Sequence, residues 1–369
     1  MSFYRILKHI LRVSAYCKKG ISVISSSNVT MKRPEVYVTR ILPSPGIEIL
    51  EKDCTVEVNR SEGAPAKAEL IRKIAQKDGL LCLLTEKIDR EVMEAAPNLR
   101  VISSYSVGYD HIDVTEATRR GIYVTYTPGV LTDATADFAW TLMMSMARRV
   151  TEADRYVRGG KWKISWSPTM LVGGAVYGKT LGILGLGRIG SALAKRAMGF
   201  DMKVLYYDEI RPPKEREEEL HLHYRPMEDI LREADFVSIH VPLTDKTRHL
   251  INYESLKMMK PTAYLVNTAR GGVVDTEGLA RALREGIIAG AGLDVHEKEP
   301  IEMSNPLLKL EGKCILAPHI ASGTVEARSK MAEMAANNLI SVLKGETPPG
   351  LVNPDVMKVK PLSNVKMIT

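Results

Sequence analysis

Short apolar runs alternate with helix-forming stretches along the first third of the chain. Five such runs begin within residues 35–125: EVYVTR, CTVEVN, GLLCLLT, LRVISSY and GIYVTYT. Helical stretches separate them, for example at residues 66–77 and 89–95, the second with the start signal KIDREVM. Strands that alternate with helices form parallel sheets through right-handed crossovers. The pattern therefore predicts a small parallel α/β unit.

A long apolar helical face follows at residues 132–149, TDATADFAWTLMMSMARR. Its beginning, rich in Asp and Thr, is typical of a helix start, and the pattern indicates a helix that links domains or packs between subunits. Further strands and helices continue to Pro318. The run at residues 325–343 then predicts one strong helix with no strand after it, so we expect this helix to return to the first unit.

The most specific motif is LGILGLGRIG at residues 181–190, where an apolar strand passes into Gly185, Gly187 and Gly190. Glycine at these positions allows a tight turn, close approach of the backbone to a pyrophosphate, and close packing of the next helix. A helix-forming stretch follows, and a second strand, MKVLYYD, ends at Asp208. Strand, glycine turn, helix and distant acid together predict a dinucleotide-binding site.

Asp208 indicates which dinucleotide is bound. Its carboxylate can accept both ribose hydroxyls of NAD, whereas it would repel the 2′-phosphate of NADP. We therefore expect NAD. Arg211, three residues further on, is placed to reach the 2′-phosphate, so NADP is a second candidate cofactor.

These elements predict an α/β fold with two Rossmann/flavodoxin-like domains, the nucleotide-binding domain being inserted into a discontinuous substrate domain. The expected bounds are residues 31–130 and 319–369 for the substrate domain and residues 131–318 for the NAD(P)-binding domain. Residues 1–30 form an extension that we expect to lie outside the fold. A ligand between the domains would meet the carboxyl ends of the strands, where SYSVGYD and the glycine turn both occur.

The net charge of +7 is carried by the residues that precede Glu35 and not by the rest of the chain. Of the 51 Lys and Arg residues, seven precede the first acid, Glu35, and the remaining 44 balance the 44 Asp and Glu residues. Global charge therefore gives no argument for a nucleic-acid partner. The extension lacks acids, as targeting peptides do, and a basic surface arm is an alternative, but Met31 before KRPEVYVTR favours a start at that residue.

The sequence contains no apolar run near the roughly 18 residues that a membrane span needs, and no convincing secretory signal. Its four cysteines are scattered without metal or disulfide spacing, which is typical of a reducing compartment. His221 and His223 form an H-x-H pair without an evident third ligand, so we expect no metal. These observations predict a cytoplasmic protein.

Three polar residues recur at predicted strand ends in the segments YLVNTARGG, AGLDVHEKEP and CILAPHIAS: Arg270, Glu299 and His319. Their order and surroundings resemble the D-isomer-specific 2-hydroxyacid dehydrogenases, whose motifs N-T-x-R-G, D-V-x-x-x-E-P and P-H-I are all present. The resemblance covers about residues 31–355. The segments YSVGYDHID, TPGVLTDATADFAW and HVPLTDKTRHLI resemble most the glyoxylate and hydroxypyruvate reductase branch.

The resemblance implies catalytic roles for Arg270, Glu299 and His319. Arg270 would hold the carboxylate and carbonyl of a 2-oxo acid with its planar fork and stabilise the developing alkoxide. His319 would protonate the carbonyl oxygen while hydride arrives from the nicotinamide. Glu299 would accept a hydrogen bond from the other imidazole nitrogen and favour the protonated ring. His296 and Glu297 flank the same loop, but the resemblance places the acid at Glu299, directly before a proline.

The resemblance also assigns binding residues. The backbone N–H groups of Val107 and Gly108 would bind the substrate carboxylate, together with Arg270 and His319. Trp166 would either close the pocket, in a neighbouring subunit, or serve as a buried anchor. The expected cofactor-binding residues are Gly185, Gly187, Arg188, Ile189, Gly190, Asp208, His240, Val241, Pro242, Thr268, Ala269, Arg270, Asp294, His319 and Ala321.

We therefore expect a homodimeric NAD(P)H-dependent 2-hydroxyacid dehydrogenase that reduces glyoxylate or hydroxypyruvate to the hydroxy acid. D-lactate or broad 2-ketoacid reduction and 3-phosphoglycerate dehydrogenation are alternatives of the same class. A non-catalytic NAD-sensing partner protein, as among the co-repressors that share this fold, is the alternative from another class.

Overall fold

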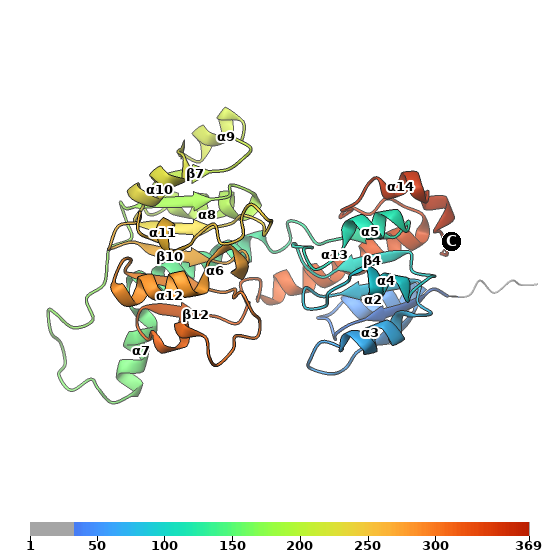
Figure 1. Ribbon diagram of the computed structural model, residues 1–369, viewed down its shortest axis with the longest axis horizontal. Helices are drawn as coiled ribbons and strands as arrows, with labels where there is room; N and C mark the ends of the chain where they lie inside the picture. The colour runs from blue at the N-terminus through green and yellow to red at the C-terminus, as the bar shows by residue number, and fades with distance from the viewer. Residues whose placement is uncertain (1–32, 369) are drawn as a thin grey trace, which may run out of the picture. The chain divides into compact units, whose positions relative to one another are not determined.

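The structure, a computed structural model, describes residues 33–368. The expectations for the extension at residues 1–30 and for a start at Met31 lie outside these residues. The described part of the chain contains two parallel β-sheets, each with helices beside it (Figure 1). No helix within this part is long and apolar enough to cross a membrane.

The first sheet is formed by the five apolar runs at the start of the chain. Its strand order is β2-β1-β3-β4-β5, and every neighbouring pair is parallel. This is the flavodoxin-like order, in which the chain reverses its direction of progress between β1 and β3. The strands are β1 (Glu35–Val38), β2 (Thr55–Val58), β3 (Gly79–Cys82), β4 (Val101–Ser104) and β5 (Tyr123–Thr125). The helices are α2 (Gly46–Asp53), α3 (Lys67–Ile74), α4 (Arg90–Glu94) and α5 (Val114–Arg119).

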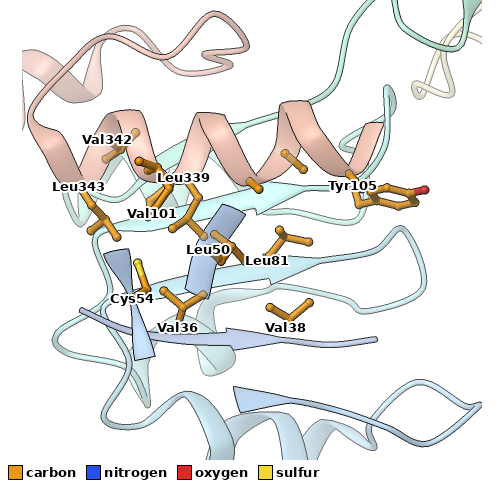
Figure 2. Close-up of a cluster of buried hydrophobic side chains, with 14 of the residues drawn as sticks. Val36, Val38, Leu50, Cys54, Leu81, Val101, Tyr105, Leu339, Val342 and Leu343 are labelled. Carbon is orange, nitrogen blue, oxygen red and sulfur yellow. The ribbon is translucent and has the colours of Figure 1, made fainter. Parts of the chain in front are cut away.

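The last long helix, α13 (Val325–Lys344), packs on the first sheet, as the sequence predicted. Buried apolar side chains of the helix and the sheet form one cluster, which includes Val36, Leu81, Val101, Leu339, Val342 and Leu343 (Figure 2). Each such side chain stabilises the packing by about 1.5–3 kcal/mol relative to exposure. The first sheet and its helices are therefore built from two separate stretches of chain. The short helices α14 (Val356–Val359) and η3 (Leu362–Asn364) complete the second stretch.

The second sheet has the strand order β12-β11-β10-β9-β6-β7-β8 and is also parallel. From β6 the chain adds β7 and β8 on one side and then β9 to β12 on the other, which is the Rossmann order with one further strand. The strands are β6 (Thr180–Leu184), β7 (Lys203–Tyr207), β8 (Leu222–Tyr224), β9 (Phe236–Ile239), β10 (Tyr264–Asn267), β11 (Gly290–Leu293) and β12 (Cys314–Leu316). The helices are α7 (Val150–Arg158), α8 (Arg188–Met198), α9 (Lys214–Glu219), α10 (Met227–Glu233), α11 (Tyr253–Leu256), α12 (Thr276–Glu285), η1 (Gly271–Val273) and η2 (Pro306–Lys309).

Helix α6 (Thr132–Ala147), which the sequence predicted to link domains or subunits, packs on the second sheet. Its side chains Leu142 and Met143 are buried in the core of that sheet, and Met146 is buried against Gly290 of β11. A β-carbon at Gly292 of β11 would lie 3.0 Å from Cβ of Leu142, so the helix lies directly against this strand. The methionines are core side chains that fill the gap between helix and sheet.

Candidate active site

The glycine turn lies between β6 and α8. Gly185 has a φ of 94°, and a β-carbon there would lie 2.7 Å from the carbonyl carbon of His240. A β-carbon at Gly190 would lie 2.2 Å from the carbonyl oxygen of Gly185, so the helix packs against the turn. Gly187 is the N-cap of α8, makes no side-chain cap, and has open space beside it. The N–H groups at this helix start therefore fit the pyrophosphate of a dinucleotide.

Asp208 follows β7 directly, and its carboxylate supports the glycine turn. Oδ2 accepts a hydrogen bond from the N–H of Leu186 at 2.6 Å, and Oδ1 accepts one from the N–H of Ile210 at 3.1 Å. Arg211 instead pairs with Glu217 at 2.7 Å. The positive charge of Arg211, which was the sequence's argument for NADP, is thus paired with Glu217. The carboxylate of Asp208 lies at the glycine turn.

Two polar residues that follow neighbouring strands also fit the expected cofactor. His240 lies with Nε2 2.9 Å from Oγ of Ser238, and burial lowers the pKa of His240 to about 4, so its ring is neutral at neutral pH. Thr268 is buried, and its hydroxyl has no hydrogen-bond partner within residues 33–368. Because an unpaired buried hydroxyl costs roughly 1–3 kcal/mol, this group is suited to meet a ligand. Val241, Pro242 and Ala269 continue the same two loops.

Asp294 follows β11 and fixes the loop after β12. Its Oδ1 accepts from the N–H of Ile320 at 2.8 Å and its Oδ2 accepts from the N–H of Ala321 at 2.7 Å. Its backbone carbonyl accepts from the N–H of His319 at 2.8 Å. Burial raises the pKa of Asp294, although the two N–H groups oppose this. The resemblance implies that Asp294 lies beside the nicotinamide and that Ala321 binds the cofactor, and both stay predictions. The observed contacts of Asp294 fix the backbone at residues 319–321.

His319 and Glu299 lie in direct contact. Nδ1 of His319 is 2.8 Å from Oε2 of Glu299, whose other oxygen accepts from the N–H of His296 at 2.9 Å. Burial favours a higher pKa for Glu299, but the hydrogen bonds from His319 and His296 outweigh it and lower this pKa overall. The carboxylate is therefore ionised at neutral pH and accepts the proton on Nδ1. Nε2 of His319 has no partner within the described chain and is free for a substrate.

Glu297, the other acid in this loop, is engaged elsewhere. It accepts from the N–H of Thr276 at 2.9 Å and contacts Nε2 of His249 at 2.5 Å. The acid in contact with His319 is thus Glu299, at the place that the sequence motif indicated.

Arg270 follows β10 with its side chain fixed. Asn267 shapes the turn, because its Oδ1 accepts from the N–H of Ala269 and its Nδ2 donates to the carbonyl of Arg270 at 2.9 Å. Nη1 of Arg270 donates to the carbonyl of Ala269 at 2.8 Å, and Nε donates to Oδ1 of Asp110 at 3.0 Å. A β-carbon at Gly108 would lie 1.4 Å from Nη2, so only glycine permits this arrangement.

Val107 and Gly108 present backbone N–H groups that have no acceptor within residues 33–368. Adjacent free N–H groups in a loop form a binding place for an anion. Asp110 belongs to the same loop but was absent from the predicted site. Its motif, YSVGYDHID, was recognised, yet nothing local in the sequence pairs it with Arg270, which lies 160 positions away.

Two further candidates lie apart from these residues. Trp166 is 76% exposed, so the alternative of a buried anchor within one chain is wrong. His221 and His223 flank a buried leucine on β8, and both are exposed. In residues 33–368, no group of three or more His, Cys, Asp or Glu side chains could hold a metal ion.

Comparison with known proteins identifies the family of this chain. The pattern described as D-isomer specific 2-hydroxyacid dehydrogenase, NAD binding domain, matches residues 140–321. The glyoxylate reductase of Thermofilum pendens is 58% identical over 339 residues, which cover 92% of this chain and 100% of that protein. The chain belongs to the D-isomer-specific 2-hydroxyacid dehydrogenase family.

Solved structures show the same fold. The TT0316 protein of Thermus thermophilus has a TM-score of 0.81 and 46% identity, with 86% of this chain and 99% of that chain covered. The NADPH-dependent glyoxylate/hydroxypyruvate reductase of Sinorhizobium meliloti, in complex with NADP and malonate, has a TM-score of 0.77 and 30% identity, covering 88% and 98%. The two-domain α/β fold and the NAD(P)-dependent oxidoreductase class predicted from the sequence are thereby confirmed.

Proposed function

We propose that this dehydrogenase reduces glyoxylate or hydroxypyruvate to the corresponding 2-hydroxy acid, and that it uses NADH. The observation that carries the proposal is Arg270, which lies against Gly108 beside two free backbone N–H groups. Relatives that are named glyoxylate reductase and share more than half of their residues with this chain support the choice of substrate.

The substrate carboxylate would be bound by Val107, Gly108 and Arg270. Nε and Nη1 of Arg270 already donate to Asp110 and to the Ala269 carbonyl, which leaves Nη2, next to Gly108, for the acid. A planar guanidinium that is fixed on one side loses little freedom when it binds an anion on the other. Its permanent charge also stabilises the oxygen on which negative charge develops during reduction.

His319 would give the proton to that oxygen. Because Nδ1 donates to Glu299, Nε2 is the nitrogen left to donate to the substrate. The ionised carboxylate stabilises the imidazolium from which the proton leaves. NADH, when bound, supplies the hydride. The glycine turn, Asp208 and Thr268 are the residues that would hold this cofactor, since each offers an N–H, a carboxylate or an unpaired hydroxyl at the expected place.

The preference for NADH rests on charge. Asp208 lies at the turn, and Arg211 is paired with Glu217. Asp208→Ala should lower the ratio of kcat/KM for NADH to that for NADPH by about tenfold, which corresponds to roughly 1.4 kcal/mol of removed repulsion. Glu209→Ala, at the neighbouring exposed acid, is the matched control. A wild-type enzyme that prefers NADPH would contradict the proposal.

We further propose a cytoplasmic homodimer with the domain bounds given above. Large apolar side chains are exposed on α7 and on the chain that follows it, and burial against a second copy would remove them from water. They are Val150, Val157, Trp162, Ile164, Trp166, Val172 and Tyr177. Cys82 and Cys314 form no disulfide, which fits a reducing compartment.

The test of the function is NADH oxidation by the purified protein with four acids: glyoxylate, hydroxypyruvate, pyruvate and 3-phosphohydroxypyruvate. We expect the highest kcat/KM for glyoxylate or hydroxypyruvate. A clear preference for pyruvate would favour D-lactate or broad 2-ketoacid reduction instead. A clear preference for 3-phosphohydroxypyruvate would favour a 3-phosphoglycerate dehydrogenase. Absence of turnover with all four, while NADH still binds, would favour an NAD-sensing partner protein.

A further inference from the structure

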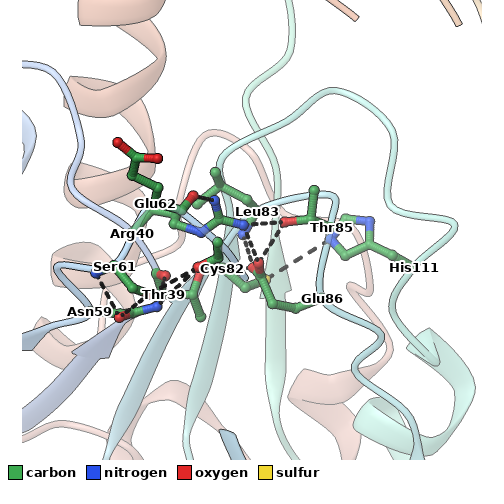
Figure 3. Close-up of polar contacts among 11 residues, drawn as sticks. Thr39, Arg40, Asn59, Ser61, Glu62, Cys82, Leu83, Thr85, Glu86 and His111 are labelled. Carbon is green, nitrogen blue, oxygen red and sulfur yellow. Dashed lines mark hydrogen bonds and ion pairs between the residues drawn. The ribbon is translucent and has the colours of Figure 1, made fainter. Parts of the chain in front are cut away.

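A chain of side-chain hydrogen bonds joins His111 to the backbone of Gly108. Nε2 of His111 lies 3.3 Å from Oγ of Ser104, which lies 2.6 Å from Oγ of Ser106. Oγ of Ser106 lies 2.6 Å from the carbonyl oxygen of Gly108. The ring of His111 also faces Cys82 at the end of β3, with Nε2 3.9 Å from Sγ (Figure 3). Ser104 and Ser106 are both buried, so this series of hydrogen bonds lies inside the protein. It leads from the carboxyl end of β4 to the loop at residues 107–110, which we call the substrate loop.

The number of available hydrogens determines which group donates in each of these hydrogen bonds. A serine hydroxyl has one hydrogen to donate, and a carbonyl can only accept. Ser106 therefore donates to Gly108 and accepts from Ser104, which in turn must accept from Nε2–H of His111. Burial lowers the pKa of His111 to about 4, so the ring is neutral at neutral pH and its single proton lies on Nε2.

The same hydrogen bonds attach both ends of the loop at residues 107–110 to β4. Ser106 precedes the loop and His111 follows it, and both side chains contact Ser104, the last residue of β4. The backbone carbonyl of His111 also accepts from the N–H of Ile88 at 2.8 Å. A loop that is attached at both ends to one strand has few conformations left to lose when a ligand binds.

We propose that His111 is a positioning residue for substrate binding, which acts through Ser104 and Ser106 to fix the backbone of Gly108 so that the free N–H groups of Val107 and Gly108 face the substrate carboxylate. The proposal rests on the function proposed above and adds to it a residue that touches neither substrate nor cofactor. Donors that are already in place bind the acid in the ground state and in the transition state alike. Loss of the chain should therefore raise KM for the acid and leave kcat nearly unchanged.

The first test compares Ser106→Ala with Ser103→Ala. Ser103 lies on β4 next to Ser104 and is buried like Ser106, but its hydroxyl donates to the carbonyl of Ala335, away from the loop. With glyoxylate and NADH, we expect Ser106→Ala to raise KM for glyoxylate by about 3- to 10-fold, the usual effect of one lost hydrogen bond. Ser103→Ala should keep the wild-type KM, and both variants should keep the Kd for NADH.

The second test replaces the histidine. The side-chain amide of His111→Gln can still donate to Ser104, whereas His111→Leu cannot. KM for glyoxylate should rise in the order wild type, His111→Gln, His111→Leu, with kcat within about twofold throughout. If the leucine variant does not fold, Ser106→Ala and the glutamine variant decide between the outcomes.

A spectroscopic readout is independent of turnover. Imidazole ¹⁵N shifts of the whole protein should identify Nε2 of His111 as the protonated nitrogen at neutral pH, and Ser106→Ala should shift this signal while Ser103→Ala should not. Protonation at Nδ1, or equal KM values in the Ser106 and Ser103 variants, would overturn the proposal. Absence of glyoxylate turnover in the wild type would instead contradict the proposed function, and the ¹⁵N result would still test the chain of hydrogen bonds.

Discussion

Asp110 accepts a hydrogen bond from Nε of Arg270 at 3.0 Å, although the two residues belong to loops of different sheets. Arg270 is thus held by the loop that also contains Gly108. With Nη1 bound to the carbonyl of Ala269, two of its three nitrogens are occupied within the protein. Its orientation, and not only its charge, is therefore set before an acid arrives.

The first prediction concerns the guanidinium group of Arg270. Arg270→Lys should lower kcat/KM for glyoxylate by about 10- to 100-fold, because an ammonium group cannot contact Asp110, Ala269 and the acid at once, and a charge-assisted hydrogen bond is worth roughly 1.5–3 kcal/mol. Steady-state kinetics with varied glyoxylate measures the loss. The control is Arg281→Lys, where the arginine lies exposed beside Glu285 on α12. Equal kinetics in the two variants would show that charge alone suffices.

The second prediction concerns the proton. His319→Ala should lower kcat by about 10²- to 10⁴-fold, the usual contribution of general acid catalysis. NADH binding, followed by fluorescence titration, should stay close to that of the wild type. His223→Ala, at an exposed histidine of β8, serves as the comparison. Near-normal turnover without the imidazole would rule out His319 as the proton donor.

The third prediction concerns pH. Hydrogen bonds from His319 and His296 outweigh burial and keep the pKa of Glu299 below its usual value, so its negative charge is present throughout the neutral range and favours the imidazolium. Glu299→Gln removes this charge. The alkaline fall in the rate of glyoxylate reduction should therefore begin at lower pH in the variant.

Glu297→Gln provides the matched control, because Glu297 contacts His249 and lies two positions from Glu299. Its pH profile should follow that of the wild type. A shift in the Glu297 variant with none in the Glu299 variant would reverse the assignment of the two acids.

The fourth prediction concerns stability. Burial lowers the pKa of His111 and of His240 to about 4, below the ordinary value for histidine. Between about pH 6.5 and 4 the unfolded chain binds protons on these rings that the folded chain does not, so stability falls as the pH is lowered through this window. The slope should reach at most about 1.4 kcal/mol per pH unit for each ring.

Urea unfolding at pH 7.5 and at pH 5 measures this effect. His111→Gln should lose part of the pH dependence, whereas His223→Gln should keep it. A stability that does not change between the two pH values would mean that neither ring is buried in its neutral form.

Much of the fold followed from periodicity. Residues 325–343 were predicted as one helix, and α13 spans Val325–Lys344. The glycine turn also followed, because it depends on one short motif with fixed spacing. The contact of Glu299 with His319 was expected only from the resemblance of their two motifs to the family, since the residues lie 20 positions apart. The inserted arrangement of the second sheet could be inferred from the helix that lacked a strand partner.

The contacts of the substrate loop could not be predicted in this way. Residues 105–111 form neither helix nor strand, so no period indicates which side chains point inward. Ser104, Ser106 and His111 meet only because the loop folds back on the end of β4. The pairing of Asp110 with Arg270 depends on the placement of two loops and has no local signal at all.

Gly271 has a consequence for how such a site can change over evolutionary time. A β-carbon there would lie 1.9 Å from the carbonyl carbon of His296, so the backbone after Arg270 and the backbone before Glu299 touch without any side chain between them. Arg270, proposed to bind the acid, and the Glu299–His319 pair, proposed to donate the proton, thus lie on backbone segments that are in direct contact. We expect substitutions in the loop at residues 107–110 other than those of Gly108 and Asp110, which lie against Arg270, to alter which acid is accepted while the reacting groups keep their spacing, so that new substrate ranges need not be accompanied by new chemistry.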